Sequence, residues 1–409
     1  MASRIGWIDF SKEHRDRVFS VIDMLGEPGT VDELGIGVVR DALADWLFPG
    51  ISTIQTRPKY FLLIPRLLQD YVTAYKAGLK VPVLEQWLKE KEHELMHELA
   101  KNYDYQDNNG VIGISVARND GELARRASSI YWNGIRVHGI VDTFYSLSDY
   151  LRVNDLSGIV KGREDKEERD DPDQFSELEG FSLQLQKFDQ PDGPLLLDLS
   201  VSEARFLIDQ FRDDLGGKKR PENLLKQLMI TPGFADYARD ADKFSTFAGL
   251  MLADGRLPDS SAHILRLALD FSFIIHGAHI RYNISLHKLS GVADFGEDWE
   301  DWRAEFTANK HRYKHFDLQF LLQSVAPQTK RFTQVFIRNW YQTLMEDELD
   351  VMRLDNLVRN QEIINKGGKA KLTGRSGEFS GWVGIGNINF RFPQLKTLLW
   401  DLHNALSNA

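Results

Sequence analysis

The sequence predicts a predominantly helical α+β protein, and three observations support this fold class. Much of the 409-residue chain has apolar residues at helical spacing, as in residues 261–289. Two short apolar runs, residues 60–64 and 110–117, have the composition of buried strands. Glycines interleave with apolar residues over residues 374–392 and predict a glycine-rich β-hairpin. Because 42% of the residues are hydrophobic, the chain can bury a sizeable core.

The N-terminal part, residues 1–160, is predicted to be a small mixed α/β domain. Residues 11–47 have helical spacing, and Thr30-Val-Asp-Glu33 has the form of a capping box. Pro49-Gly50 should end that helix. The first strand, residues 60–64, is limited by Pro65, and residues 67–102 return to helix with a break at residues 78–82.

A helix-turn-helix-like segment is predicted over residues 127–153. The strand at residues 110–117 precedes a short helix that Ser128 could cap, and Gly139 separates this helix from a second one, at about residues 142–153. Ordinary helical hairpins have the same outline and are commoner. The outline alone therefore leaves both interpretations open.

The rest of the chain is predicted to be a charged linker, residues 161–180, and a mainly helical C-terminal domain, residues 181–409. The linker carries many charges and almost no apolar residue. The helices expected after it are residues 200–216, 261–289, 299–325, 329–360 with a break near residues 346–348, and 394–406. The glycine-rich hairpin would precede the last helix.

Composition narrows the classes of function. The chain has no cysteine, which excludes disulfides, thiolate nucleophiles and iron–sulfur clusters and fits a cytoplasmic location. The N-terminus does not resemble a signal peptide, and Arg266, Asp270 and His276 interrupt the longest apolar tract, so we expect no membrane contact. A net charge of −10 argues against a protein that coats nucleic acid, although local basic patches can still bind phosphate.

Basic and aromatic residues gather in three turn-rich blocks, which are the predicted contacts with nucleic acid or a partner. Cationic and hydrogen-bonding side chains of this kind bind phosphate, and aromatic rings stack on bases. The alternative is that they hold the fold together. The candidate residues are Thr53, Gln55, Thr56, Arg57 and Lys59; Arg125, Arg126, Tyr131, Trp132 and Arg136; and Lys366, Lys369, Lys371 and Arg375.

Catalytic motifs are weak, and we expect no metal and no cofactor. His93-Glu-Leu-Met-His97 has the spacing of a zinc protease, but its charged neighbours are typical of a solvated helix. Arg281 and His287 resemble the pair of a helical ribonuclease, yet six residues in a helix do not bring them face to face.

Four motifs resemble those of a bacterial family, domain of unknown function 6361. They are Phe48-Pro-Gly-x-Ser-Thr-Ile-Gln-Thr-Arg-x-x-Tyr-Phe61, Ser128-Ser-Ile-Tyr-Trp-x-Gly134, Gly277-Ala-x-x-x-Tyr-Asn283, and the stretch from Lys366 to Leu372 with the Trp-Gly run after it. This chain departs from the family pattern at Pro58 and in having Lys rather than Arg in the last block. The family pattern does not include His93 and His97.

The resemblance implies a role in antiphage defence, because such proteins are encoded near helicases and phospholipase-D-like nucleases. We therefore expect a non-catalytic, nucleic-acid-engaging or scaffolding subunit of a bacterial antiphage defence complex, with a helicase or phospholipase-D-like nuclease as its partner and DNA as a further ligand. One alternative is a metal-dependent hydrolase or a ribonuclease. Another is an adaptor that binds only proteins.

Overall fold

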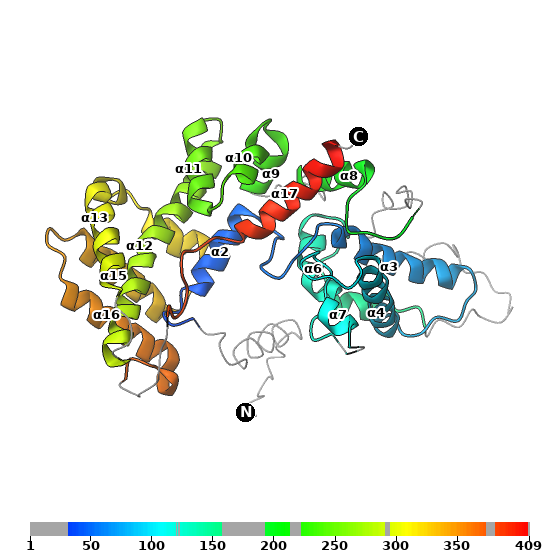
Figure 1. The fold of residues 1–409 in the computed structure, drawn as a ribbon, viewed down its shortest axis with the longest axis horizontal. Coiled ribbons are helices and arrows are strands. Elements are labelled where there is room, and N and C mark those ends of the chain that lie inside the picture. Colours follow the sequence, from blue (N-terminus) through cyan, green and yellow to red (C-terminus); the bar gives the residue numbers. More distant parts are fainter. Residues whose placement is uncertain are drawn as a thin grey trace, which may run out of the picture. The chain divides into compact units, whose positions relative to one another are not determined.

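The computed structural model describes residues 32–119, 121, 123–157, 193–212, 222–290, 295–373 and 381–407. Regular structure in these residues is helical, and none of them forms a β-strand (Figure 1). The predicted α+β class is therefore wrong for the described part of the chain, which is all-helical. The predicted linker at residues 161–180 lies outside the described residues, so the division of the chain at that point stays a prediction.

The chain forms two compact units. Unit 1 takes its residues from 1–43 and 263–390, and unit 2 takes its residues from 44–262 and 391–409. Two helices, α2 (Gly37–Leu47) and α12 (Asp259–Ser290), contribute residues to both. Asp32 caps α2, because its carboxylate accepts the backbone N–H groups of Ile36 and Gly37 at 2.9 and 2.6 Å.

Unit 2 is built from short and medium helices. They are α3 (Tyr60–Lys76), α4 (Leu84–Asn102), α5 (Ile114–Ala117), α6 (Ala127–Val137), α7 (Leu147–Val153), α8 (Val201–Arg212), α9 (Leu224–Ile230), α10 (Phe234–Asp240), α11 (Phe244–Asp254) and α17 (Phe392–Ser407). Helix α3 packs on α4 and α6, and α17 packs on α8 and α10. The ring of Phe61 contacts those of Tyr131 and Phe211 edge-on, so α3, α6 and α8 share one aromatic core.

Residues 60–64 form the first turns of α3 rather than the predicted strand. All five side chains are buried. A helix that is buried on every side is apolar throughout, as a buried strand is, so a short apolar run cannot distinguish a helix from a strand. The turn starts before the run, since the N–H of Leu63 donates to the carbonyl of Lys59 at 3.0 Å. Pro65 lies inside the helix, where it removes one backbone hydrogen bond.

The second predicted strand, residues 110–117, is also wrong. Gly110 and Gly113 have φ values of 88° and 83°, in the left-handed region that ends an extended chain. The following residues form the single helical turn α5, which begins directly after Gly113. Gly110 and Gly113, which were predicted to lie in a strand, therefore form turns that lead the chain into α5.

Unit 1 consists mainly of long helices. They are most of α12, then α13 (Gly296–Tyr313), α14 (Leu318–Phe320), the π-helical turn η2 (Leu321–Val325), α15 (Arg331–Met345), α16 (Val351–Lys366) and the 3-10 turn η3 (Gly367–Lys369). Figure 1 shows α15 and α16 side by side. The indole of Trp340 on α15 donates to the carbonyl of Ile274 on α12 at 3.0 Å. The predicted helix at residues 261–289 and the break near residues 346–348 are confirmed.

The predicted β-hairpin at residues 374–392 is wrong for its described residues, 381–392. Side chains of α12 bind their backbone: Asn283 donates to the carbonyl of Val383 at 3.0 Å and accepts its N–H at 2.8 Å, and His287 lies 2.9 Å from the carbonyl of Gly381. The backbone groups that would pair with a second strand in a hairpin are therefore hydrogen-bonded to side chains of α12. Residues 374–380 lie outside the described part.

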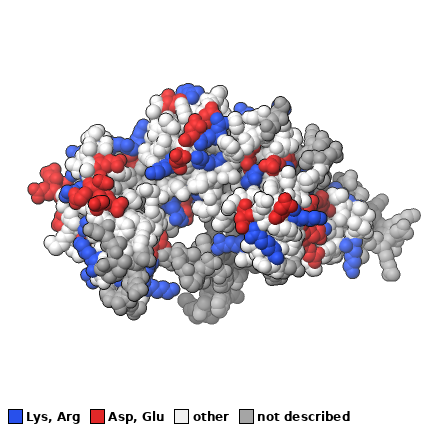
Figure 2. Space-filling model, viewed as in Figure 1, with Lys and Arg blue, Asp and Glu red and all other residues white. Residues whose placement is uncertain are grey.

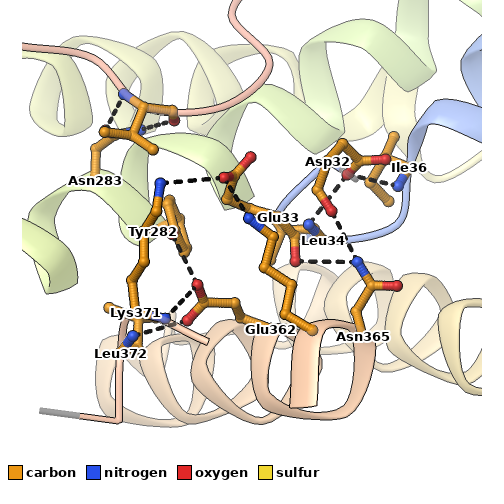
Figure 3. A network of polar contacts seen from close by, with 12 residues as sticks. Asp32, Glu33, Leu34, Ile36, Tyr282, Asn283, Glu362, Asn365, Lys371 and Leu372 are labelled. Carbon is orange, nitrogen blue, oxygen red and sulfur yellow. Dashed lines mark hydrogen bonds and ion pairs between the residues drawn. The ribbon is translucent and has the colours of Figure 1, made fainter. Parts of the chain in front are cut away.

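A buried polar network lies in unit 1 next to this segment (Figure 3). Glu362 accepts the hydroxyl of Tyr282 at 2.9 Å and the N–H groups of Lys371 and Leu372 at 2.9 Å each. Glu33 accepts the ammonium of Lys366 at 2.6 Å. The network thus attaches the chain after α16 to α12 and to the segment before α2.

Candidate nucleic-acid interface

The first block of candidate residues forms the turn before α3, and its polar side chains bind backbone within unit 2. Gln55 donates to the carbonyl of Gly50 at 2.9 Å, and the hydroxyl of Thr56 donates to the carbonyl of Gly110 at 2.7 Å. Thr53 is exposed, and its carbonyl accepts the side chain of Gln394 at 2.9 Å. The block therefore contacts two segments that are distant in sequence, the turn at Gly110 and the start of α17.

The two cations of this block form ion pairs inside unit 2. Arg57 donates to Asp401 at 2.5 Å and to Asp198 at 2.8 Å. Burial lowers the pKa of Arg57, but hydrogen bonds and charge from the two carboxylates raise it more, so its pKa lies above the ordinary value. Lys59 is 2% exposed and contacts Glu203 at 2.5 Å.

The two aromatic residues of the second block, Tyr131 and Trp132, lie in the core. The hydroxyl of Tyr131 accepts the N–H of Thr56 at 2.8 Å and donates to the carbonyl of Arg57 at 2.9 Å. The indole of Trp132 donates to the carbonyl of Tyr145 at 3.1 Å. Both rings are at most 5% exposed, so neither is placed to stack on a base.

Ser128 does not cap α6 as expected. Arg126 is the residue before the helix, and Ser128 instead donates its N–H and hydroxyl to Glu92 at 2.6 and 2.9 Å. Burial raises the pKa of Glu92, although these hydrogen bonds and the charge of Arg126 lower it. This buried contact fixes α6 on α4 and thereby decides which side of α6 faces solvent.

The solvent side of α6 is cationic and polar. Arg125 is exposed just before the helix, and Ser129 and Asn133 are exposed one turn apart along it. Arg136 follows on the same side and is half-buried. The sequence of α6 contains no acidic residue, so this side of the helix carries positive charge only. Arg126 lies beside it, 3.8 Å from Glu92.

Two exposed aromatic residues extend this side of α6. Phe144 is 72% exposed and Tyr145 is 38% exposed. The guanidinium of Arg136 donates to their carbonyls at 2.9 and 3.2 Å, which fixes the loop that carries the rings. We call Arg125, Arg126, Ser129, Asn133, Arg136, Phe144 and Tyr145 the α6 face.

In the sequence, Asp142 lies between Arg136 and Phe144, and Glu122 and Asp149 lie three and four residues from the two ends of the α6 face. Asp142 is exposed, whereas Asp149 pairs with Arg152 at 2.7 Å and accepts the hydroxyl of Ser146 at 2.8 Å. Ser146 also caps α7. Helices α6 and α7 pack on each other, and the helix-turn-helix interpretation of residues 127–153 stays a prediction.

The third block belongs to unit 1, where Glu33 brings two of its cations together. Lys366 lies 2.6 Å and Lys371 3.5 Å from Glu33. Burial raises the pKa of Glu33, but the hydrogen bond from Lys366 and the charges of both lysines lower it below its ordinary value. Lys369 is exposed, and Arg375 lies outside the described residues. On the face seen in Figure 2, basic and acidic residues are interspersed, so a cationic contact has to be sought locally.

The catalytic alternatives have the following geometry. His93 and His97 lie on the exposed side of α4 with their Nε2 atoms 3.1 Å apart, and the part of the chain that the structure describes has no group of three His, Cys, Asp or Glu that could hold a metal. Arg281 and His287 are buried and contact different partners: Arg281 pairs with Asp355 at 2.7 Å, and His287 lies next to Gly381.

Sequence reasoning found the arginines of the α6 face but not its exposed aromatic residues. Phe144 and Tyr145 stand between Gly139 and the helix cap Ser146, where a turn carries side chains outward. Two adjacent aromatic residues in such a turn were the available signal. None of the described helices has the length and apolar character needed to cross a membrane.

No curated protein and no solved structure matches this chain. Residues 2–164 match the model of a family described as a family of unknown function, DUF6361. The matched range contains the motifs at residues 48–61 and 128–134, together with the α6 face, and it ends before the two later motifs. Residues 2–164 are therefore a domain of unknown function 6361.

Proposed function

We propose that this chain is a non-catalytic subunit of a bacterial antiphage defence complex and that it engages single-stranded nucleic acid through the α6 face. The observation that carries the proposal is the combination on this face of exposed cationic, polar and aromatic side chains with a helix that has no acidic residue. The family resemblance supports the setting in defence.

Each part of the α6 face has a chemical role in this proposal. The guanidinium groups of Arg125 and Arg126 bind phosphate oxygens. Asn133 donates to phosphate or base edges, and the hydroxyl of Ser129, which already donates to the carbonyl of Arg126 at 2.7 Å, accepts a hydrogen bond from a base edge. The rings of Phe144 and Tyr145 stack on bases.

Stacking on exposed rings requires bases that are not paired, which is why we favour single strands over a duplex. A helicase partner would produce such strands, and a phospholipase-D-like nuclease would cut them. In this proposal the chain works in the cytoplasm and holds the strand for its partner. No reacting group on the chain is required for this role.

The test is binding of the purified protein to labelled single-stranded DNA, duplex DNA and single-stranded RNA over a salt series. Arg125→Glu should weaken single-strand binding by about tenfold or more, because it reverses a charge that contacts phosphate. Phe144→Ala should remove about 1–3 kcal/mol of binding free energy, as expected for one stacked base. Both side chains are exposed, so both variants should fold.

The matched control is Arg212→Glu, which reverses an arginine at the end of α8 whose side chain is 46% exposed. This variant should bind like the unmodified protein. Absence of binding at low salt, or equal weakening in the control, would refute the role of the α6 face. Complex formation with a protein partner that resists nuclease treatment would then favour an adaptor.

A further inference from the structure

A second surface in unit 2 favours a positively charged ligand, whereas the α6 face favours a negatively charged one. It is a cleft of about 580 Å³ between the polar side of α17 and two turns, at residues 55–57 and 108–110. Its volume lies in the range of sites that hold small ligands or a few residues of a peptide. Helix α17 contributes Gln394, Thr397, Trp400 and Asn404, which recur at helical spacing along one side.

Negative charge prevails among the described residues that line this cleft. Arg57 contributes one positive charge, and Asp198 and Asp401 contribute two negative ones. The guanidinium already donates to both carboxylates and, at 3.2 Å, to the carbonyl of Asn109. The side chain of Asp401 is 5% exposed, whereas that of Asp198 is 69% exposed and accessible to a ligand. A phosphate would be repelled here, and a cation would be attracted.

An exposed indole completes the lining. Trp400 precedes Asp401 on α17 and is 55% exposed. Indole is the aromatic group that binds cations best, and it binds guanidinium and ammonium groups over its face. Asn108 and Asn404 add side-chain amides from two different walls. Each amide carries both a donor and an acceptor, as a peptide group does, so the pair matches a polypeptide better than a polyamine.

We propose that this cleft binds an arginine or lysine side chain of a partner protein. The cation lies over Trp400 and pairs with Asp198, and the backbone on either side of it binds Asn108 and Asn404. This site is separate from the α6 face and differs from it in the sign of the charge that it binds. The two sites therefore let one unit hold nucleic acid and a protein together.

The test uses the full chain and three probes at low ionic strength, with binding measured by calorimetry. The first probe is the capped pentapeptide Gly-Gly-Arg-Gly-Gly, the second has citrulline in place of arginine, and the third is spermidine. The arginine peptide should bind at least tenfold more tightly than the citrulline peptide, which has the same shape without the charge. Asp198→Asn and Trp400→Ala should each weaken binding of the arginine peptide at least fivefold.

The matched control is Asp209→Asn on α8, since Asp209 is also an exposed aspartate paired with an arginine, with a side chain 67% exposed. This variant should bind the arginine peptide as tightly as the unmodified protein does. Arg125→Glu should also bind it equally tightly, so the result for the cleft does not depend on whether the α6 face binds nucleic acid. Equal binding of the arginine and citrulline peptides, no binding, or no effect of either cleft variant would overturn the proposal. Tighter binding of spermidine than of the peptide would overturn the choice of a protein ligand.

Discussion

The ion pair between Lys59 and Glu203 gives the sharpest prediction about stability, because it is buried and joins the start of α3 to α8. The ammonium and carboxylate are 2.5 Å apart, and each side chain is 3% exposed. The ammonium also donates to the carbonyl of Asp198 at 3.1 Å, and the carboxylate accepts the N–H of Ser200 at 2.8 Å. Neither charge has access to bulk water.

Removing one member of such a pair leaves the other charge buried without compensation. Lys59→Met and Glu203→Gln should therefore each lower the free energy of unfolding by about 3–5 kcal/mol. The double variant Lys59→Met with Glu203→Leu removes both charges and should recover most of this stability, because an apolar pair of similar volume is often as stable as a buried ion pair. Urea unfolding followed by circular dichroism at pH 7 measures all three.

An exposed ion pair on α4 provides the control. Lys91 and Glu94 are 2.6 Å apart, but their side chains are 33% and 63% exposed. Lys91→Met should cost less than about 1 kcal/mol. If Lys59→Met costs no more than Lys91→Met, or if the double variant is less stable than both single variants, the reasoning from burial is refuted.

Three further predictions concern other parts of the structure. Gly110→Ala should lower the melting temperature of the protein and cost about 1–3 kcal/mol, because φ is 88° and a Cβ would clash with Cγ of Arg57; a melting temperature equal to that of the unmodified protein would contradict this. Burial of His279 lowers its pKa from 6.5 to about 3, so below pH 6.5 the unfolded chain binds a proton that the folded chain does not. Stability should thus fall by up to about 1.4 kcal/mol per pH unit towards pH 3 and hold above pH 6.5, and His279→Leu should reduce this slope in urea unfolding measured over pH. Glu362→Gln removes the charge from a carboxylate that accepts one hydroxyl and two backbone N–H groups, so limited proteolysis should cut residues 367–373 faster than in the unmodified protein; an equal rate would show that the charge is not needed there.

The long helices could be predicted from the sequence because their apolar spacing is extended and their ends are marked. Residues 261–289 are an example, since α12 covers them completely. The short apolar run at residues 60–64 could not be assigned in the same way, because its structure depends on burial on all sides. The hairpin prediction for the glycine-rich segment was wrong for a related reason, because the backbone of this segment binds Asn283, about 100 residues earlier in the sequence.

The sequence identified the arginines of the α6 face as candidate contacts. Long-range ion pairs explain why other candidate cations, such as Lys59, do not belong to this face. Arg125, Arg126 and Arg136 lie on or beside the exposed side of α6. Lys59 has the same charge and a similar local context, but it pairs with Glu203, 144 residues later, and nothing in the local sequence indicates this partner. Local composition identifies a cation, whereas the fold decides whether its side chain is buried or exposed.

The salt dependence of single-strand binding tests the central proposal most directly. Removing one phosphate-binding cation should reduce the slope of log K against log salt concentration by about 0.7. We expect a clear salt dependence for the unmodified protein and a slope shallower by at least this amount for Arg125→Glu, with Arg212→Glu unchanged. Identical slopes for the unmodified protein and Arg125→Glu would contradict the assignment of the α6 face as the nucleic-acid interface.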